Sequence, residues 1–313
     1  FTRPLFFDPM NEQIVILDFG SQYTQVIARR VRECNVFSTI LRYDTPATEI
    51  ARLSPSGIIL SGGPDSVYEK GAPACDPGVY ALGIPILGVC YGMQLLAKEL
   101  GGKVVPGAER EYGSREIQTV APSCLLDGMK KVWMSHGDSV QEAPPGFAVV
   151  GRTEHTPVAA FENDNGLLAG VQFHPEVMHT EYGQEILRHW LIDIVKCKPT
   201  WTTDNIIENE VISIKSQVGN GRVICGLSGG VDSAVAAAIV QRAIGNQLTC
   251  VFVDHGLLRE GEPEQVERDF VASTGVNLVV VDAKELFLSA LKGVTDPEEK
   301  RKIIGREFIR AFE

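Results

Sequence analysis

The sequence predicts an α/β protein built from two three-layer domains. Short apolar runs alternate with longer amphipathic patterns, which indicates buried, largely parallel strands joined by helices that cover both faces of a sheet. A segment around Pro199 interrupts this alternation, and the strand–helix pattern then restarts. The length of 313 residues suits two domains of ordinary size.

The first domain is expected to contain an open mixed sheet with helices on both faces. Glycine-containing turns follow two of its predicted strands. Between residues 103 and 171 the apolar runs become shorter and richer in turn residues, which predicts added antiparallel strands. The expected elements are strands 13–17, 57–60 and 85–88 and helices 23–31, 91–100 and 180–196.

The domain boundary is expected just after the helix over 180–196. Pro199 cannot continue that helix, and Asp204 can cap the next one. The second domain is expected to be a parallel-sheet unit that is incomplete at its C-terminus, because a charged helical pattern reaches Glu313 without a capping signal. We therefore expect a leader or extension at 1–11, a first domain at 12–198, a linker at 199–205 and a second domain at 206–313.

Composition excludes several classes of function. The formal net charge is −11 and no Lys/Arg cluster stands out, which argues against a nucleic-acid-binding surface. The seven cysteines include no CxxC pair and lie within apolar runs, as is typical of reduced, cytosolic thiols. No segment has the roughly 18 apolar residues of a membrane span, and the N-terminus lacks a secretory pattern. We expect a soluble cytoplasmic protein that binds neither nucleic acid nor membrane.

Cys90 is the candidate nucleophile. It lies in the segment GVCYG, between a predicted strand and a predicted helix, where Gly88 and Gly92 permit a sharp turn that exposes the central side chain. The amides and dipole of the helix N-terminus would lower the thiol pKa, and the backbone N–H of Tyr91 would point to where an oxyanion forms. Taken alone, this motif favours a buried cysteine at an ordinary strand–helix turn.

His174 and Glu176 supply the other parts of a catalytic triad. Pro175 favours extended geometry at His174, so the side chains of His174 and Glu176 share a face. Glu176 can then hydrogen-bond one imidazole nitrogen while the other nitrogen faces a thiol. A solvated loop would explain this segment equally well. The glycine turn at 61–64 could donate a second oxyanion N–H from Gly63, or be a plain strand–helix turn.

With these residues the chain resembles the class I glutamine amidotransferases. Their SGGP, GxCxGxQ and HPE segments match residues 61–64, 88–94 and 174–176 in the same order. The resemblance implies that Cys90 attacks the side-chain amide of glutamine, that His174 protonates departing ammonia, and that water hydrolyses a γ-glutamyl thioester. It also implies that the α-amino and α-carboxylate groups of glutamine are held by Gln94, Ser135, His136, Gly137 and Asp138. His136 could equally be a packed turn residue.

A second motif, SGGVDS at 228–233, lies between a predicted strand and a helix. Consecutive N–H groups and the helix N-terminus would form an anion-binding nest, although the spacing fits neither a kinase-type nor a dinucleotide loop. The motif resembles the PP-motif of the ATP pyrophosphatases. That resemblance implies binding of ATP, with Asp232 holding Mg²⁺ and no organic prosthetic group. The implied ATP-binding residues are Ser228, Gly229, Gly230, Val231, Asp232, Ser233 and Val253.

The order of the two domains is similar to that of one family of glutamine-dependent carbon–nitrogen ligases, which make GMP. That resemblance implies glutamine, ATP and xanthosine monophosphate (XMP) as substrates. ATP would adenylylate XMP with release of pyrophosphate, and ammonia from the Cys90 site would then displace AMP. It also implies a homodimer of the full-length enzyme through a C-terminal domain beyond this sequence. We expect only the glutaminase half to be whole here.

Two alternatives stay open. Another PP-motif amidating or thiolating enzyme, such as one that acts on tRNA, is disfavoured by the acidic balance and the lack of paired cysteines. A non-catalytic or glutaminase-only fragment that binds glutamine or nucleotide would also fit the sequence. Ammonia release that survives loss of the Cys90 thiol would exclude the thiol mechanism.

Overall fold

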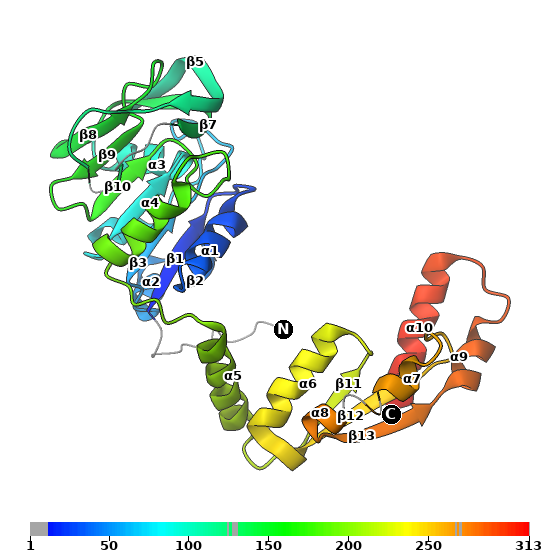
Figure 1. Ribbon diagram of the computed structural model, residues 1–313. Helices are drawn as coiled ribbons and strands as arrows, with labels where there is room; N and C mark the ends of the chain where they lie inside the picture. Colours follow the sequence, from blue (N-terminus) through cyan, green and yellow to red (C-terminus); the bar gives the residue numbers. More distant parts are fainter. Residues whose placement is uncertain (1–11, 124, 127–130, 267, 269–270, 313) are drawn as a thin grey trace. The chain divides into compact units, whose positions relative to one another are not determined.

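The computed structural model describes residues 12–312, except 124, 127–130, 267 and 269–270 (Figure 1). The expected leader or extension at 1–11 lies outside the described residues. The chain divides into two compact units, residues 1–202 and 203–313. Among the helices described, none is long and apolar enough to cross a membrane.

An eight-stranded mixed sheet forms the middle of the first unit, in the order β2-β1-β3-β4-β10-β9-β8-β6. The strands from β2 to β10 in this order run parallel, and β9, β8 and β6 add antiparallel pairs. The open mixed sheet predicted from the sequence is confirmed. The strands are β1 Gln13–Asp18, β2 Phe37–Arg42, β3 Gly57–Leu60, β4 Ile86–Val89, β6 Gln118–Thr119, β8 Phe147–Arg152, β9 Ala160–Asn163 and β10 Leu168–Val171.

Both faces of this sheet are buried, as the apolar strands require. Along β1, Ile14 and Ile16 belong to one apolar cluster, whereas Val15 and Leu17 belong to a second, because successive side chains of a strand point to opposite faces. Helices contribute apolar side chains to each cluster, which gives three layers. The first cluster includes side chains of α1 Thr24–Glu33 and α4 Gly183–His189, and the second includes those of α2 Ala47–Arg52, the 3₁₀ turn η1 Pro77–Ala81 and α3 Tyr91–Glu99.

The two longest strands of the first unit stand apart from the main sheet. β5 (Lys103–Glu116) and β7 (Lys131–Glu142) form a separate antiparallel ribbon (Figure 1). Their register shifts between Pro106 and Glu111, where a proline lacks the N–H that a regular ladder needs. The added antiparallel strands were expected, but the sequence did not reveal that they form a second sheet.

The helix expected over 180–196 is shorter and less regular than predicted. α4 begins at Gly183 and continues as a π-helical turn, η2 Trp190–Ile194. A Cβ atom at Gly183 would lie 2.1 Å from the carbonyl oxygen of Pro175. Glycine is therefore needed at the start of α4, because this end of the helix packs directly against the backbone that carries His174.

The second unit contains a three-stranded parallel sheet in the order β11-β12-β13, as predicted. An apolar cluster lies on each of its faces, although Ile224 in β11 and Val279 and Val280 in β13 are exposed. Leu227 and Phe252 belong to one cluster, and Val253 and Phe287 to another. The elements are α5 Thr203–Val218, β11 Val223–Leu227, α6 Val231–Ile244, η3 Gly245–Gln247, β12 Leu248–Asp254, α7 Glu262–Gln265, α8 Val271–Thr274, β13 Asn277–Asp282, α9 Lys284–Leu291 and α10 Pro297–Phe312.

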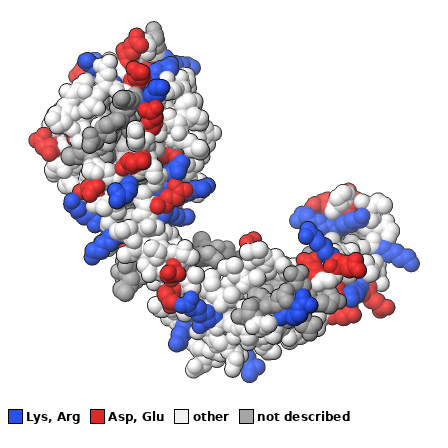
Figure 2. Space-filling view, viewed as in Figure 1, with Lys and Arg blue, Asp and Glu red and all other residues white. Residues whose placement is uncertain are grey.

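One boundary of the second unit differs from expectation. α5 begins at Thr203 rather than at residue 206. Residues 262–265 and 271–274 are helical, as α7 and α8, and residues 267 and 269–270 between them lie outside the described residues. Acidic and basic side chains are interspersed over the visible face of each unit (Figure 2).

Candidate active site

Cys90 lies at a strained turn between β4 and α3. Its backbone has φ +53° and ψ −106°, in the region that favours glycine. A Cβ at Gly92 would lie 2.2 Å from the carbonyl oxygen of Leu60, and one at Gly88 would lie 2.7 Å from the backbone of Gly92. The two glycines therefore let α3 start directly against β3, and the turn places Cys90 at the carboxyl end of the parallel strands.

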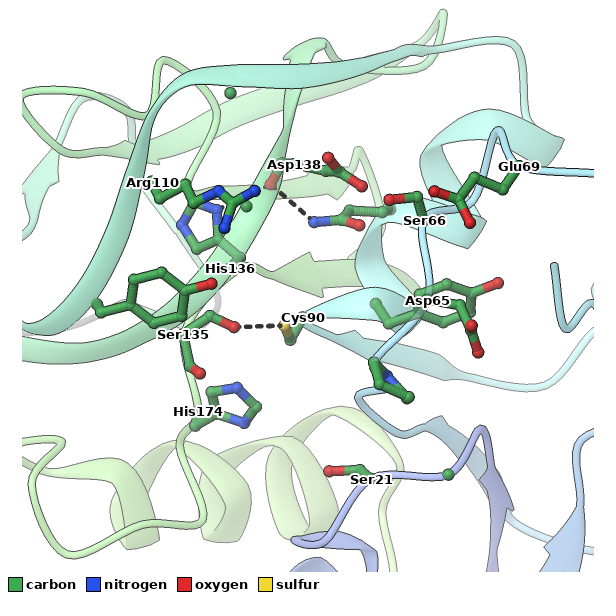
Figure 3. A pocket seen from close by; sticks show the side chains of 18 of the residues that line it. Ser21, Asp65, Ser66, Glu69, Cys90, Arg110, Ser135, His136, Asp138 and His174 are labelled. Atoms are coloured by element: carbon green, nitrogen blue, oxygen red, sulfur yellow. Dashed lines mark hydrogen bonds between the residues drawn. The ribbon is translucent and has the colours of Figure 1, made fainter.

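The thiol of Cys90 is almost completely buried at the bottom of a pocket. Its Sγ lies 3.7 Å from the carbonyl oxygen of Ser135, to which it can donate, and 3.7 Å from Nε2 of Gln172, which donates to it. Figure 3 shows Cys90 near the middle of the pocket, with Ser135 beside it and His174 below it in this view. The sequence did not single out Gln172. It precedes His174 by two residues, so the argument that placed Glu176 on the face of His174 would have found it.

His174 and Glu176 form a buried pair. Nδ1 of His174 lies 2.8 Å from Oε1 of Glu176, and both side chains are at most 4% exposed. Burial disfavours the charged imidazole, but Cys90 and Glu176 more than offset this effect and raise the pKa of His174 to about 10. The imidazole is therefore protonated at neutral pH beside the sulfur of Cys90.

Three contacts hold the backbone of the His174 loop. The Thr180 hydroxyl donates to the carbonyl of His174 at 2.6 Å, and the His174 N–H donates to the carbonyl of Trp133 at 3.0 Å. Nε of Arg30 donates to the carbonyl of Glu176 at 2.9 Å. The loop is thus tied to β7 on one side and to α1 on the other, which fixes the imidazole before any ligand arrives.

Gly63 and Tyr91 line the same pocket as Cys90. A Cβ at Gly63 would lie 2.8 Å from the carbonyl oxygen of Phe19 and 3.2 Å from the ring of Tyr91, so the 61–64 turn packs tightly against the start of α3. Within the described part of the chain, no acceptor hydrogen-bonds the backbone N–H of Gly63 or of Tyr91. Both N–H groups remain available to a developing oxyanion.

The pocket has a volume of about 710 Å³ and collects nearly all the predicted site residues of the first unit. Glu176 is the exception, because it lies behind His174. The amide of Gln94 donates to the carbonyl of Asp138 at 2.9 Å and to Gln172 at 3.2 Å. The predicted residues that line the pocket are Gly63, Cys90, Tyr91, Gln94, Ser135, His136, Gly137, Asp138 and His174.

His136 has the geometry of a packed residue. Its Nδ1 bonds the carbonyl of Asp138 at 2.8 Å, and its Nε2 lies 3.5 Å from the buried carboxylate of Glu111. Burial lowers the pKa of His136, although Glu111 acts in the opposite direction. The Glu111 carboxylate in turn accepts hydrogen bonds from Thr153 and Thr156. The sequence offered no signal for Glu111, because a lone charged residue in a strand is usually solvated.

Several pocket residues were not predicted. Asp65, Ser66, Tyr68 and Glu69 directly follow the 61–64 turn, and this proximity in sequence could have identified them. The Tyr68 hydroxyl donates to Oδ1 of Asp138 at 2.6 Å. The remaining lining residues come from the β1–α1 loop and from β5: Gly20, Ser21, Gln22, Tyr23, Pro106, Gly107, Arg110 and Tyr112, with Pro64 beside the 61–64 glycines.

In the second unit, the predicted loop 228–233 connects β11 to α6. The Ser233 hydroxyl accepts from the Ser228 N–H at 3.1 Å and donates to the carbonyl of Gly230 at 3.0 Å. Gly229 has φ +78°, which favours glycine at this turn. Val231 is 78% exposed at the helix start, and the N–H groups of Ser228 and Gly230 are hydrogen-bonded to the Ser233 and Ser228 hydroxyls within the loop.

Asp232 and Val253 lie differently with respect to this loop. Asp232 is exposed in the first turn of α6, and no described residue pairs with its carboxylate. Val253 is buried in the core, and the β11–β12 register places it one residue beyond the partner of Leu227, next to the start of the loop. The described residues contain no cluster of three metal-binding side chains. A Mg²⁺ ion here would use Asp232, nearby hydroxyls and phosphate oxygens, which are suitable hard ligands.

The fold and the pocket define a class of protein: an α/β domain with a candidate cysteine nucleophile at a strained strand–helix turn and a histidine–carboxylate pair beside it. The chain belongs to the class I glutamine amidotransferase family, whose family model matches residues 15–194. The NAD synthase family model matches residues 203–305.

Curated relatives match both units at once. The chain is 60% identical over 308 residues to a glutamine-hydrolyzing GMP synthase of Parafrankia sp., covering 97% of this chain and 58% of the relative. It is 58% identical over 305 residues to the protein of the same name from Thermobifida fusca, covering 96% and 58%. The chain thus spans about 58% of the length of these relatives.

A solved structure supports the fold of the first unit. A protein of Thermoplasma acidophilum, provisionally assigned as one of the subunits of a GMP synthase, aligns with a TM-score of 0.54 at 28% identity. The alignment covers 59% of this chain and 94% of the solved one. The amidotransferase fold expected from the sequence is therefore confirmed.

Proposed function

We propose that this chain supplies the glutamine-hydrolysing site and part of the ATP site of an enzyme that converts XMP to GMP. The observation that carries the proposal is the buried Cys90–His174–Glu176 group in a pocket that also presents two free backbone N–H groups. The high identity to GMP synthases across both units supports the choice of XMP over other acceptors. A reduced cytoplasmic location belongs to the proposal, supported by six described cysteines that are all free thiols.

The pocket geometry suits thioester chemistry. The Cys90 thiolate attacks the side-chain carbonyl carbon of glutamine, and the resulting oxyanion receives hydrogen bonds from the N–H groups of Tyr91 and Gly63. His174 gives its proton to the amide nitrogen, so the C–N bond breaks and ammonia leaves. Neutral His174 then takes a proton from water, which attacks the thioester and releases glutamate and the thiolate. Glu176 keeps the imidazole oriented in both steps.

In the second unit, the nest at 228–233 would hold the pyrophosphate end of ATP, with Asp232 beside its Mg²⁺ ion. Adenylylation of the XMP oxygen releases pyrophosphate, and ammonia then displaces AMP. Nothing described in this unit indicates an XMP pocket. We place the XMP site and the surface of a homodimer in the part of the enzyme that corresponds to the additional length of the relatives.

The glutaminase proposal is tested with a matched pair of cysteine variants. Cys90→Ala should reduce ammonia release from glutamine by at least about 1,000-fold, because it removes the nucleophile. Cys75→Ala should leave the rate unchanged, since Cys75 is buried in the same unit and donates only to Tyr80. Ammonia release by the Cys90→Ala chain at the wild-type rate would overturn the proposal.

One observation favours an alternative to XMP as the acceptor of ammonia: residues 203–305 match the NAD synthase family model. That match is compatible with another adenylylated nucleotide in place of XMP. Isotope exchange between ATP and pyrophosphate in the longer enzyme separates the two. Exchange that depends on XMP supports GMP formation, whereas exchange that depends only on another carboxylated or oxo nucleotide supports the alternative.

A further inference from the structure

Two cysteines of the second unit lie directly opposite each other. Cys225 in β11 is the register partner of Cys250 in β12, and the two strands run parallel. Opposite residues of neighbouring strands are about 5 Å apart and point to the same face of the sheet. Both side chains accordingly belong to one apolar cluster, to which α6 also contributes. The other described cysteines, Cys34, Cys75, Cys90 and Cys197, all lie in the first unit.

This arrangement meets the requirements of a disulfide. Two cysteines can be joined when their Cα atoms lie roughly 4.4–6.8 Å apart and their side chains do not point away from each other. The β11–β12 register satisfies the first condition, and the shared apolar cluster satisfies the second. The Cys225 thiol also donates to the carbonyl of Gly226, but at 3.8 Å this weak bond does not hold it away from Cys250.

The two thiols differ in their access to solvent. Cys225 is partly exposed, whereas Cys250 is completely buried. Burial raises the pKa of Cys250 to about 11, and the neighbouring Cys225 acts in the same direction through its charge and a hydrogen bond. Since the thiolate is the form that reacts with an oxidant, Cys250 is protected from direct oxidation. A redox-sensitive cysteine is typically accessible and lies next to a second cysteine that resolves its oxidised form. Cys225 suits the first role and Cys250 the second.

We propose that Cys225 and Cys250 form a reversible disulfide when the protein meets hydrogen peroxide. The Cys225 thiolate attacks one oxygen of the peroxide, the O–O bond breaks, hydroxide leaves, and Cys225 becomes a sulfenic acid. The Cys250 thiol then attacks the Cys225 sulfur, so the S–S bond forms, the S–O bond breaks, and the hydroxide leaves with the Cys250 proton as water. The two thiols are oxidised, and the peroxide is reduced to water. A thiol reductant restores both side chains.

The disulfide would join two strands at the predicted ATP-binding loop. Cys225 lies three residues before Ser228, so the strand that leads into the 228–233 loop would be tied to β12. Neither thiol lines the Cys90 pocket. The pair is therefore a modification site separate from the proposed function, and it responds to peroxide rather than to a substrate.

The test is peptide mapping of the full chain after exposure to hydrogen peroxide. Free thiols are blocked with N-ethylmaleimide, and the protein is digested without a reductant. Trypsin places Cys225 and Cys250 in separate peptides, residues 223–242 and 243–259, so a disulfide between them joins two peptides that are otherwise apart. We expect this linked pair to be the main disulfide of the second unit and to separate again on treatment with dithiothreitol.

Three variants test the order of the two steps. In Cys250→Ala the sulfenic acid of Cys225, trapped with dimedone, should rise roughly 10-fold or more over the wild type, because no neighbouring thiol removes it. In Cys225→Ala the buried Cys250 should stay unmodified. The matched control is Cys75→Ala, which removes a buried thiol of the first unit that donates to Tyr80 and should leave the linked pair unchanged.

Three results would overturn the proposal. The first is a wild-type chain in which peroxide oxidises Cys225 without forming the linked pair. The second is a main disulfide that joins Cys225 to any cysteine other than Cys250 of the same chain. The third is a Cys225 thiol that peroxide leaves unmodified. All three are measured on the wild type, so they decide the matter even if Cys250→Ala fails to fold.

Discussion

Replacing Gly92 by alanine should both destabilise the first unit and disable the candidate thiol site. The added Cβ would lie 2.2 Å from the carbonyl oxygen of Leu60 and 2.6 Å from its Cβ, so the first turn of α3 must move away from β3 until these atoms are at least 3.0 Å apart. The contact atom is backbone, which cannot rotate away as a flexible side chain would. We expect a loss of about 1–3 kcal/mol in the free energy of unfolding.

The same displacement moves the thiol and the N–H of Tyr91 relative to His174. A misplacement of this size, on the order of 1 Å, can reduce a rate by about 100-fold. Urea unfolding followed by tryptophan fluorescence measures the first effect, because Trp133, Trp190 and Trp201 all lie within the first unit. Ammonia release from glutamine measures the second.

The matched control is Gly305→Ala in α10, where an added Cβ meets nothing within 4 Å. It should leave the fluorescence transition and the glutaminase rate unchanged. The reasoning would be refuted if Gly92→Ala unfolded at the same urea concentration as the wild type and also kept its activity. A loss of activity without a loss of stability would point to the geometry of the turn alone.

Three further changes follow from contacts of the same unit. Thr180→Val removes the hydroxyl that donates to the carbonyl of His174. We expect a loss of about 1–3 kcal/mol in the free energy of unfolding and a lower glutaminase rate. The conservative Thr180→Ser variant keeps the hydroxyl and should show neither effect. Thr156→Val removes a 2.5 Å hydrogen bond to the buried carboxylate of Glu111, which should cost about 1–3 kcal/mol in urea unfolding; an unchanged midpoint would contradict it. The pKa of His174 is raised to about 10, so its contribution to stability is full below its ordinary value of 6.5 and is lost as pH rises through 10. Stability of the wild type should fall across that interval more steeply than that of His174→Asn, and parallel curves would exclude a raised pKa.

Much of the fold follows from the sequence because its strands are apolar on both faces. The runs at β1, β3 and β4 are almost entirely buried, and glycine turns follow two of them, so periodicity and turn chemistry agree. The β5–β7 ribbon could not be located in this way. In β7, His136 occupies a buried position, with its Nε2 3.5 Å from the buried Glu111 carboxylate. No pattern of apolar residues marks such a strand.

The residues of the candidate site likewise fall into those that the sequence predicted and those that it did not. Residues that act through the backbone or through local spacing were predictable: the flanking glycines of Cys90, and His174 two positions before Glu176. Arg110, which is exposed and also lines the pocket, was not predicted, since a charged residue in a polar strand gives no signal of a site. Its place in the pocket depends on the irregular register after Pro106, which is a property of the pairing between two distant strands rather than of either sequence.

The position of β10 has a consequence for how the site matures. This strand pairs with β4 on one side and with β9 on the other, so the last strand of the sheet to be synthesised enters its interior rather than its edge. Cys90 follows β4 directly and His174 follows β10 by three residues. The thiol therefore meets its imidazole only when the sheet closes around β10, at a large separation in sequence from β4. A nascent or partly folded chain carries Cys90 without His174 beside it. Completion of the sheet is then the event that brings the thiol and the imidazole together.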